Sequence, residues 1–162
     1  MSEYRVGMGF DAHALGEGVP LVLGGVSIDH PRGLAGHSDG DVLAHALIDA
    51  VLGAAGLGDI GALFPSDDER YRGASSLELL ADAYAQVLAA GWMLVNADCV
   101  LVGEEPRIAG HRDEMRRRLS AAVGGGEVNV RATTTDGLGF TGRGEGLAAH
   151  AVALLERPST EP

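Results

Sequence analysis

The hydrophobic and polar positions along the chain follow two different periods, which predicts strands interleaved with helices. Strands are predicted where apolar residues run on or alternate, at residues 5–10, 21–23, 26–28, 93–102 and 128–132. Helices are predicted where apolar residues recur every three or four positions, at residues 42–51, 77–88, 115–123 and 147–155. The pattern therefore predicts one α/β domain of the two-layer α+β type at residues 1–157, followed by a flexible tail at 158–162.

Capping residues indicate where two of these helices begin. Ser75 and Glu78 stand three apart in a capping-box pattern just before the second apolar stripe. Ser38 or Asp39 is the natural N-cap of the first helix. Asp41 then places a carboxylate in the first turn, where the helix dipole favours negative charge.

Residues 36–45 concentrate histidine, aspartate and serine at the start of that first helix. Asp41, His45 and Asp49 are spaced four apart, so they stack on one helix face. A metal-binding histidine usually gives its second ring nitrogen to a carboxylate, and this stripe could supply one. The alternative is a polar helix face that carries a histidine by chance. The stretch alone leaves both interpretations open.

Further ligands for such a site stand at the end of the first strand. Asp11 and His13 point to the same face if the extended conformation persists past residue 10. Asp-x-His alone is a weak signal that arises by chance in many sequences, so its value depends on a third ligand, for which His45 is the best candidate. Three protein ligands would leave a fourth tetrahedral position open, as in catalytic zinc sites.

Several other polar positions carry weaker signals. Asp59 lies in a glycine-rich stretch, as a partner for ligand hydroxyls or as part of a solvated connection. Thr133 to Asp136 end a predicted strand, either as a site or as ordinary strand threonines. His30 is predicted to be an exposed loop residue. The arginines at 112–118 alternate with acidic residues, which predicts a solvated helix face rather than a phosphate site.

The composition of the chain argues against nucleic acids and membranes as binding partners. The formal net charge of -11 argues against nucleic acid, because phosphate backbones are held by clustered Lys and Arg. No apolar run is long enough to span a bilayer and no leader pattern is present, so the sequence predicts no membrane association. Cys99 is the single cysteine, which excludes an internal disulfide and predicts a cytoplasmic location.

Several motifs in a fixed order give the chain a family resemblance. They are Gly9-Phe10-Asp11-Ala12-His13, His37-Ser38-Asp39-Gly40-Asp41 with His45, Gly58-Asp59-Ile60-Gly61, Phe64-Pro65, Ala132-Thr133-Thr134-Thr135 and residues 139–146. With this set the chain resembles the family of 2-C-methyl-D-erythritol 2,4-cyclodiphosphate synthases of the non-mevalonate isoprenoid pathway, over nearly its whole length.

The resemblance implies a fold, an assembly and a reaction. The fold is a mixed sheet with helices on one face, and the sheets face the axis of a homotrimer whose active sites lie between subunits. The reaction converts 4-diphosphocytidyl-2-C-methyl-D-erythritol 2-phosphate to the cyclic diphosphate and releases CMP. The implied metals are zinc on Asp11, His13 and His45, and a second divalent ion, magnesium or manganese, on Asp136.

The resemblance also implies roles for individual residues. His37 and Thr134 are the implied catalytic residues, and an isoprenoid diphosphate or phosphate ligand is implied on the trimer axis. The implied substrate-binding residues are Asp11, Ala12, His13, His37, Ser38, Asp59, Ile60, Gly61, Phe64, Asp68, Glu105, Pro106, Arg107, Ala132, Thr133, Thr134, Asp136, Phe140 and Arg143. The loop at 105–107 receives the cytosine, and Phe140 and Arg143 lie near the axis.

Three positions depart from the family pattern, and two rival functions stay open. Asp136 stands where glutamate is usual, Gly137 where lysine is common, and Ser66 where an acidic residue is frequent. The first rival is a hydrolase that cuts a nucleoside diphosphate ester with a zinc-bound water. The second is a non-catalytic trimer that binds isoprenoid diphosphates.

Overall fold

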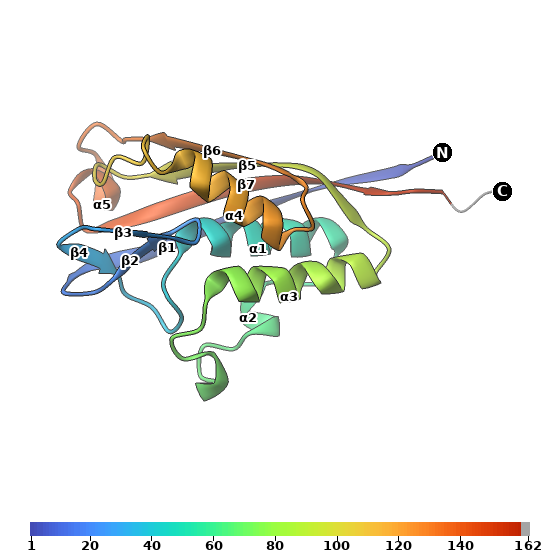
Figure 1. Ribbon diagram of the computed structural model, residues 1–162, viewed down its shortest axis with the longest axis horizontal. Helices are drawn as coiled ribbons and strands as arrows, with labels where there is room; N and C mark the ends of the chain where they lie inside the picture. Colours follow the sequence, from blue (N-terminus) through green and yellow to red (C-terminus); the bar gives the residue numbers. More distant parts are fainter. Residues whose placement is uncertain (160–162) are drawn as a thin grey trace.

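A computed structural model describes residues 1–159, and its framework is a five-stranded mixed sheet in the order β4-β1-β7-β5-β6 (Figure 1). Its strands are β1 (Glu3–Glu17), β4 (Arg32–Leu34), β5 (Met93–Val102), β6 (Glu127–Thr133) and β7 (Gly146–Arg157). β5 and β6 pair in parallel, whereas the other neighbours pair antiparallel. A separate hairpin joins β2 (Leu21–Leu23) to β3 (Val26–Ile28). Residues 160–162 of the predicted tail lie outside the described residues.

The helices form a layer on one face of this sheet (Figure 1). They are α1 (Val42–Ala55), α2 (Ile60–Leu63), the 3-10 helix η1 (Glu69–Tyr71), α3 (Ser76–Ala89) and α4 (Arg112–Ala122). The short helix α5 (Gly139–Gly142) lies apart from them at one end of the sheet, against β7 (Figure 1). α1 lies directly against β1 and β7, α3 packs on α1, and α4 contacts β6. The predicted mixed sheet with helices on one face is therefore confirmed.

α1 approaches β1 unusually closely because the facing positions of the strand are glycines. A Cβ atom at Gly9 would lie 1.8 Å from the carbonyl oxygen of Ala46, and one at Gly7 would lie 2.0 Å from that of Ala50. Neither distance is compatible with a side chain unless the helix moves. This packing fixes the start of α1 next to the end of β1, where Asp11 and His13 stand.

We expect Gly9→Ala to destabilise the fold by about 3 kcal/mol or more, because the added methyl group overpacks a rigid backbone contact. Chemical denaturation would measure the loss. Gly53→Ala is the matched control, since Gly53 lies in α1 and a Cβ atom added there would have no neighbour within 4 Å. There the same substitution is expected to be neutral or to stabilise by up to about 1 kcal/mol. Equal effects of the two substitutions would contradict the packing argument.

The opposite face of the sheet carries exposed apolar side chains. Between its buried glycines, β1 turns Val6, Met8 and Phe10 outward, and Met8 is 72% exposed. Met8 pairs directly with Val152 of β7, which is also exposed. Met93 and Val95 extend the same type of surface on β5. We call these six residues the outer apolar face.

The predicted helix at residues 147–155 is wrong, because this segment is the strand β7. Its inward positions are Ala149, Ala151, Ala153 and Leu155, which are all buried. The alanine-rich run fits a helical spacing as well as a strand alternation. The strand is favoured because the segment lies between β1 and β5 and pairs with both of them along most of its length.

The predicted N-cap of the first helix is also wrong. Asp41 caps α1 and its side chain accepts a hydrogen bond from the N–H of Ala44, so it does not lie in the first turn. The second capping prediction is confirmed, since Ser75 caps α3 by accepting from the N–H of Glu78.

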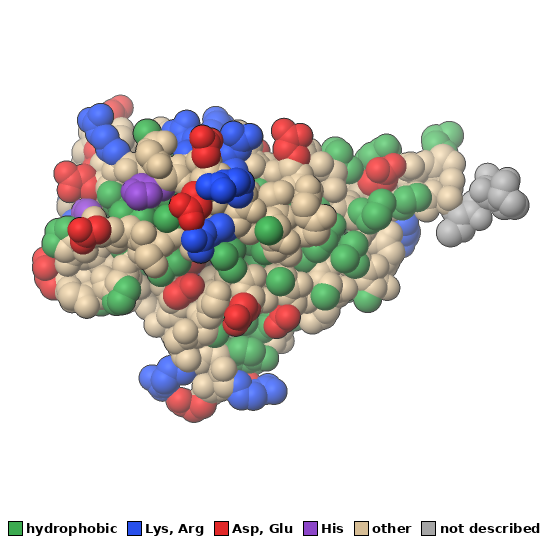
Figure 2. Space-filling model, in the orientation of Figure 1, with side chains coloured by type: hydrophobic (Ala, Val, Ile, Leu, Met, Phe, Trp, Pro, Cys, Tyr) green, Lys and Arg blue, Asp and Glu red, His purple; other side chains and the backbone are tan. Residues whose placement is uncertain are grey.

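The arginine-rich helix α4 is a solvated face, as predicted. Arg118 pairs with Glu114 at 2.6 Å, and Arg116 lies 3.8 Å from Asp113. Figure 2 shows positive and negative side chains intermixed over the upper part of the molecule, where α4 lies. Among the described residues, no helix has the length and apolar character needed to cross a membrane.

Candidate metal centre and cavity

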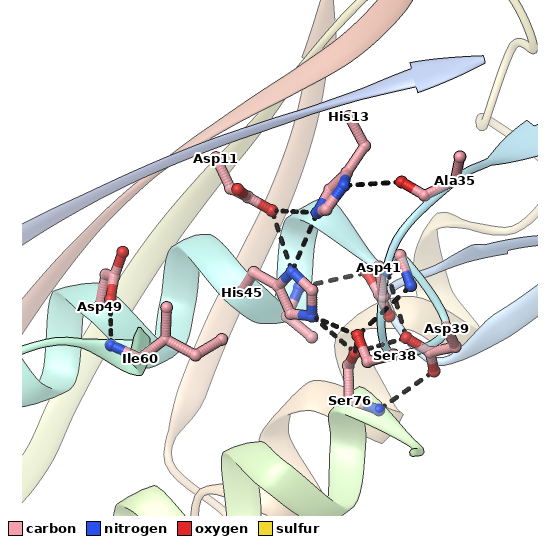
Figure 3. A network of polar contacts seen from close by, with 12 residues as sticks. Asp11, His13, Ala35, Ser38, Asp39, Asp41, His45, Asp49, Ile60 and Ser76 are labelled. Carbon is pink, nitrogen blue, oxygen red and sulfur yellow. Dashed lines mark hydrogen bonds and ion pairs between the residues drawn. The ribbon is translucent and has the colours of Figure 1, made fainter. Parts of the chain in front are cut away.

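Asp11, His13 and His45 converge on one point (Figure 3). Asp11 Oδ2 lies 2.9 Å from His13 Nε2 and 2.9 Å from His45 Nδ1. The two histidine nitrogens lie 3.3 Å apart. The polar-face interpretation of His45 does not account for this convergence, whereas the three-ligand interpretation does.

Local structure explains how residues so far apart in sequence meet. β1 remains extended through Glu17, so Asp11 and His13 project from the same side of the strand, as predicted. His45 lies in the first turn of α1, which the glycine contacts hold against that strand. The carboxylate and one imidazole are half-buried, and His45 is only 8% exposed.

The electrostatics of the cluster favour a charged carboxylate. Burial alone would raise the pKa of Asp11, but hydrogen bonds from His13 and His45 outweigh it and lower that pKa to about 2. The hydrogen bond to Asp11 in turn raises the pKa of His13, against the opposing effect of burial. Nδ1 of His13 donates to the carbonyl oxygen of Ala35 at 2.8 Å, which directs Nε2 to the cluster.

The donor set fits a divalent metal. Bonds of about 2.0–2.1 Å in tetrahedral geometry place ligand atoms about 3.3 Å apart. The observed separations of 2.9, 2.9 and 3.3 Å are close to this value, so small shifts would accommodate an ion. Two imidazoles and one carboxylate are typical zinc ligands, and three of them leave one coordination position for a substrate.

The helix stripe does not supply a carboxylate to Nε2, the second ring nitrogen of His45. Asp49 Oδ1 instead accepts from the N–H of Ile60 at 2.8 Å. Nε2 of His45 faces two hydroxyl groups, with Ser76 Oγ at 2.8 Å and Ser38 Oγ at 3.0 Å. Ser76 follows the N-cap of α3, and no pattern in the sequence marks it as a site residue.

Asp41 has a structural role beside the site. Its carboxylate accepts from the N–H groups of Gly24 and Gly25 at 2.9 and 2.7 Å, in addition to its cap of α1. Burial raises the pKa of Asp41 to about 6, while the three amides oppose that shift. Asp41 therefore connects the β2–β3 turn to the start of α1.

A cavity of about 540 Å³ opens beside the three converging residues. The predicted site residues that line it are Asp11, His13, His37, Ser38, His45, Ile60, Gly61 and Phe64. Pro65, Ser66, Asp67, Tyr71 and Leu79 line it too, although no sequence pattern points to Tyr71 or Leu79. The Nε2 of His37 donates to the Asp68 carbonyl oxygen at 2.8 Å, which orients this ring at the cavity wall.

Asp59 lies at the edge of this region with a local structural role. Its side chain caps the short helix α2 by accepting from the N–H of Ala62 at 2.9 Å. One oxygen of the carboxylate is thus engaged by the backbone, while the residue itself is exposed.

The predicted phosphate and cytosine residues form a second group, away from the cavity within one chain. Ala12, Ala148, Val102 and Thr133 are cross-strand neighbours on β1, β7, β5 and β6. Three strand spacings therefore separate Ala12 from Thr133, a distance of about 14 Å. Ala132 precedes Thr133 on β6 and Thr134 follows it, so both lie at this distant edge.

The loop at 105–107 turns the other way. The Glu105 carboxylate lies 3.9 Å from the His30 ring, and Glu105 lines a cleft with Leu15 and Arg32. His30 is therefore partly buried and not exposed as predicted.

The second group is connected by its own contacts. Asp136 has a φ of 52°, and its Oδ1 accepts from Thr134 Oγ1 at 3.1 Å. Glu104 Oε1 accepts from the N–H of Gly137 at 3.4 Å, which joins the two loops.

Phe140 lies outside both groups, in a smaller pocket beside Ala12 and His13. Arg143 is exposed and pairs with Glu145 at 3.1 Å.

The sequence matches the YgbB family over residues 4–156. The chain belongs to the YgbB family. A curated relative from Moorella thermoacetica, named 2-C-methyl-D-erythritol 2,4-cyclodiphosphate synthase, is 57% identical over 153 residues, which are 93% of this chain and 94% of that protein. The resemblance inferred from the motifs is thereby confirmed.

Solved structures agree with this YgbB assignment. A CDP-bound structure of 2C-methyl-D-erythritol-2,4-cyclodiphosphate synthase is 41% identical, with a TM-score of 0.84 over 93% of this chain and 99% of that one. The bifunctional IspDF of Campylobacter jejuni is 43% identical, with a TM-score of 0.93 over 98% of this chain. This YgbB chain spans 44% of the length of that bifunctional protein.

Proposed function

We propose that this protein is a 2-C-methyl-D-erythritol 2,4-cyclodiphosphate synthase. It would convert 4-diphosphocytidyl-2-C-methyl-D-erythritol 2-phosphate to the cyclic diphosphate with release of CMP. The observation that carries the proposal is the convergence of Asp11, His13 and His45 beside a cavity, in a chain 57% identical to a named synthase. The CDP-bound relative supports a cytidine diphosphate substrate.

The chemistry demands positioning more than acid–base catalysis. The 2-phosphate that attacks the β-phosphorus is already ionised, so no strong base is needed, but the repelling phosphates must be held in line. We assign this task to His37 and Ser38 at the cavity wall and to Thr133 and Thr134. His37 and Thr134 would also donate hydrogen bonds to the charge that develops in the transition state.

Two metals complete the proposal. Asp11, His13 and His45 would hold zinc, whose Lewis acidity makes the β-phosphorus more electrophilic. Asp136 would hold magnesium or manganese beside Thr134, because these ions favour a carboxylate together with phosphate oxygens and water. With a formal net charge of -11, the protein needs cations to bind so anionic a substrate.

The remaining substrate contacts follow from the two groups of residues. The erythritol and ribose would be surrounded by Asp59, Ile60, Gly61, Phe64, Asp68 and Ala12. Ala132 and the 105–107 loop would bind the cytidine end.

We infer that a homotrimer joins the cavity of one chain to the second group of its neighbour. The outer apolar face supports such an assembly, with Phe140 and Arg143 near its axis, where an isoprenoid diphosphate or phosphate would bind. A buried, unpaired Cys99 is in keeping with a cytoplasmic location.

Incubation of the zinc-loaded protein with the diphosphocytidyl substrate and magnesium tests the reaction. We expect phosphorus NMR to show a cyclic diphosphate and CMP, with no oxygen-18 incorporated from labelled water. Removal of both metals by a chelator is expected to stop turnover, and adding zinc and magnesium back is expected to restore it. A linear phosphorylated product that contains solvent oxygen would establish a hydrolase instead.

A further inference from the structure

We propose that Ser76 and Asp39 are positioning residues that hold His45 in the tautomer needed for metal binding. The inference rests on the proposed metal role of His45 and concerns how its ring is oriented. Asp39, Ser76 and His45 form one continuous chain of hydrogen bonds from the loop before α1 to the metal centre (Figure 3).

The orientation of the His45 ring determines which of its nitrogens can bind a metal. Nδ1 points to the cluster, 2.9 Å from Asp11 Oδ2, so a metal there requires the lone pair of Nδ1. The ring proton must then reside on Nε2 and needs an acceptor. Ser76 Oγ at 2.8 Å and Ser38 Oγ at 3.0 Å are its neighbours. A hydroxyl can donate or accept, so neither serine by itself determines the tautomer.

Asp39 removes that ambiguity. A carboxylate only accepts, and Asp39 Oδ1 receives the hydroxyl hydrogen of Ser76 in a short contact. Asp39 Oδ2 also accepts from the N–H of Ser76 at 3.0 Å, which fixes the carboxylate on this residue. With its hydrogen directed to Asp39, Ser76 Oγ presents a lone pair to His45 and accepts from Nε2–H.

The arrangement is buried and specific to one ligand. Ser76 is 0% exposed, so bulk water does not compete for its hydroxyl. His13 obtains its orientation from the backbone carbonyl of Ala35, which no side-chain substitution removes. His45 alone of the two imidazoles depends on side chains for its tautomer. Outer partners of this kind typically change metal affinity by about 10–100-fold when they are removed.

The test measures metal binding without substrate, in Ser76→Ala and Asp39→Asn. We expect the zinc affinity of Ser76→Ala, determined by competition with a chromophoric chelator, to fall about 10–100-fold. The visible spectrum of bound cobalt is expected to change as well, because the geometry of the His45 ligand is loosened. Asp39→Asn is expected to weaken zinc in the same direction, since an amide can donate to Ser76 and reverse its hydroxyl.

Ser75→Ala is the matched control. Ser75 caps the same helix through Glu78 but does not contact His45, so its removal lowers stability and leaves the metal centre intact. We expect this variant to bind zinc and cobalt like the wild type. The proposal is overturned if Ser76→Ala and Asp39→Asn both bind zinc within threefold of the wild type, whatever their thermal stability.

The result is separable from the proposed reaction. A wild-type protein that binds zinc but makes no cyclic product would refute the cyclase activity and leave the positioning test valid. A wild-type protein that binds no zinc would overturn the positioning role together with the metal role of His45.

Discussion

His45→Ala is expected to abolish both zinc retention and turnover. The substitution leaves Asp11 and His13 as two ligands, of which only one is an imidazole. Because loss of an outer partner already costs about 10–100-fold in affinity, loss of a direct ligand is expected to cost more than about 100-fold. Lewis-acid stabilisation worth several kcal/mol corresponds to at least about 10³-fold in rate. Metal analysis and phosphorus NMR on the same preparation would measure both effects.

His111→Ala provides the control for removing an imidazole. His111 precedes α4 and makes no side-chain cap to that helix, and it is not one of the three converging residues. We expect this variant to retain zinc and full turnover. Stoichiometric zinc in His45→Ala, with a rate within tenfold of the wild type, would contradict the assignment of the metal centre. Circular dichroism would verify that the buried His45 position tolerates alanine.

The ligand triad is predictable from the sequence because each member belongs to a regular element. Alternation in β1 places Asp11 and His13 on one face, and the helical stripe places His45 at the start of α1. The family motifs then indicate that these segments meet. What no pattern contains is the long-range contact itself, which depends on Gly7 and Gly9 admitting α1 close to the strand.

The predictions for residues 147–155 and for the partner of His45 are wrong because both depend on long-range contacts. The segment 147–155 satisfies both periods, so only pairing with β1 and β5 makes it a strand. Helical spacing offers a partner for His45 only on its own helix, among residues four positions away. The structure uses Ser76 instead, 31 residues along the chain and within a capping pattern that carries no sign of a second role. Tertiary hydrogen bonds of this kind leave no periodic signal.

The proposed assembly is not predictable from residue patterns alone, and its support comes from the structure of β1. Glycines occupy the positions that face the helix layer, while Val6, Met8 and Phe10 face outward. This is the reverse of a strand with one solvated face, because the large apolar side chains lie on the side away from the core. Figure 2 also shows hydrophobic side chains gathered toward the end where β1 and β7 project beyond the helices. Contiguous exposed apolar surface of this type favours association.

Met8→Glu is therefore expected to dissociate the proposed trimer and to reduce turnover strongly. The substitution places an unpaired carboxylate in the outer apolar face, once for each subunit, and burying an unpaired charge costs several kcal/mol. Light scattering after size-exclusion chromatography would report a mass near the 16.6 kDa of one chain instead of about three times that value. Zinc binding is expected to persist, because Asp11, His13 and His45 all belong to one chain.

The control is Leu88→Glu, which introduces the same charge at an apolar side chain of α3 that is 46% exposed, within the helix layer. We expect Leu88→Glu to remain trimeric and active. A trimeric Met8→Glu with normal turnover would show that the sheet face is not the interface. A monomeric Met8→Glu with full turnover would show that one chain holds a complete site. The expected combination is zinc bound but turnover lost. About 14 Å separates Ala12 from Thr133 within a chain, so in the proposed trimer the threonines that act with the metal centre come from a neighbour.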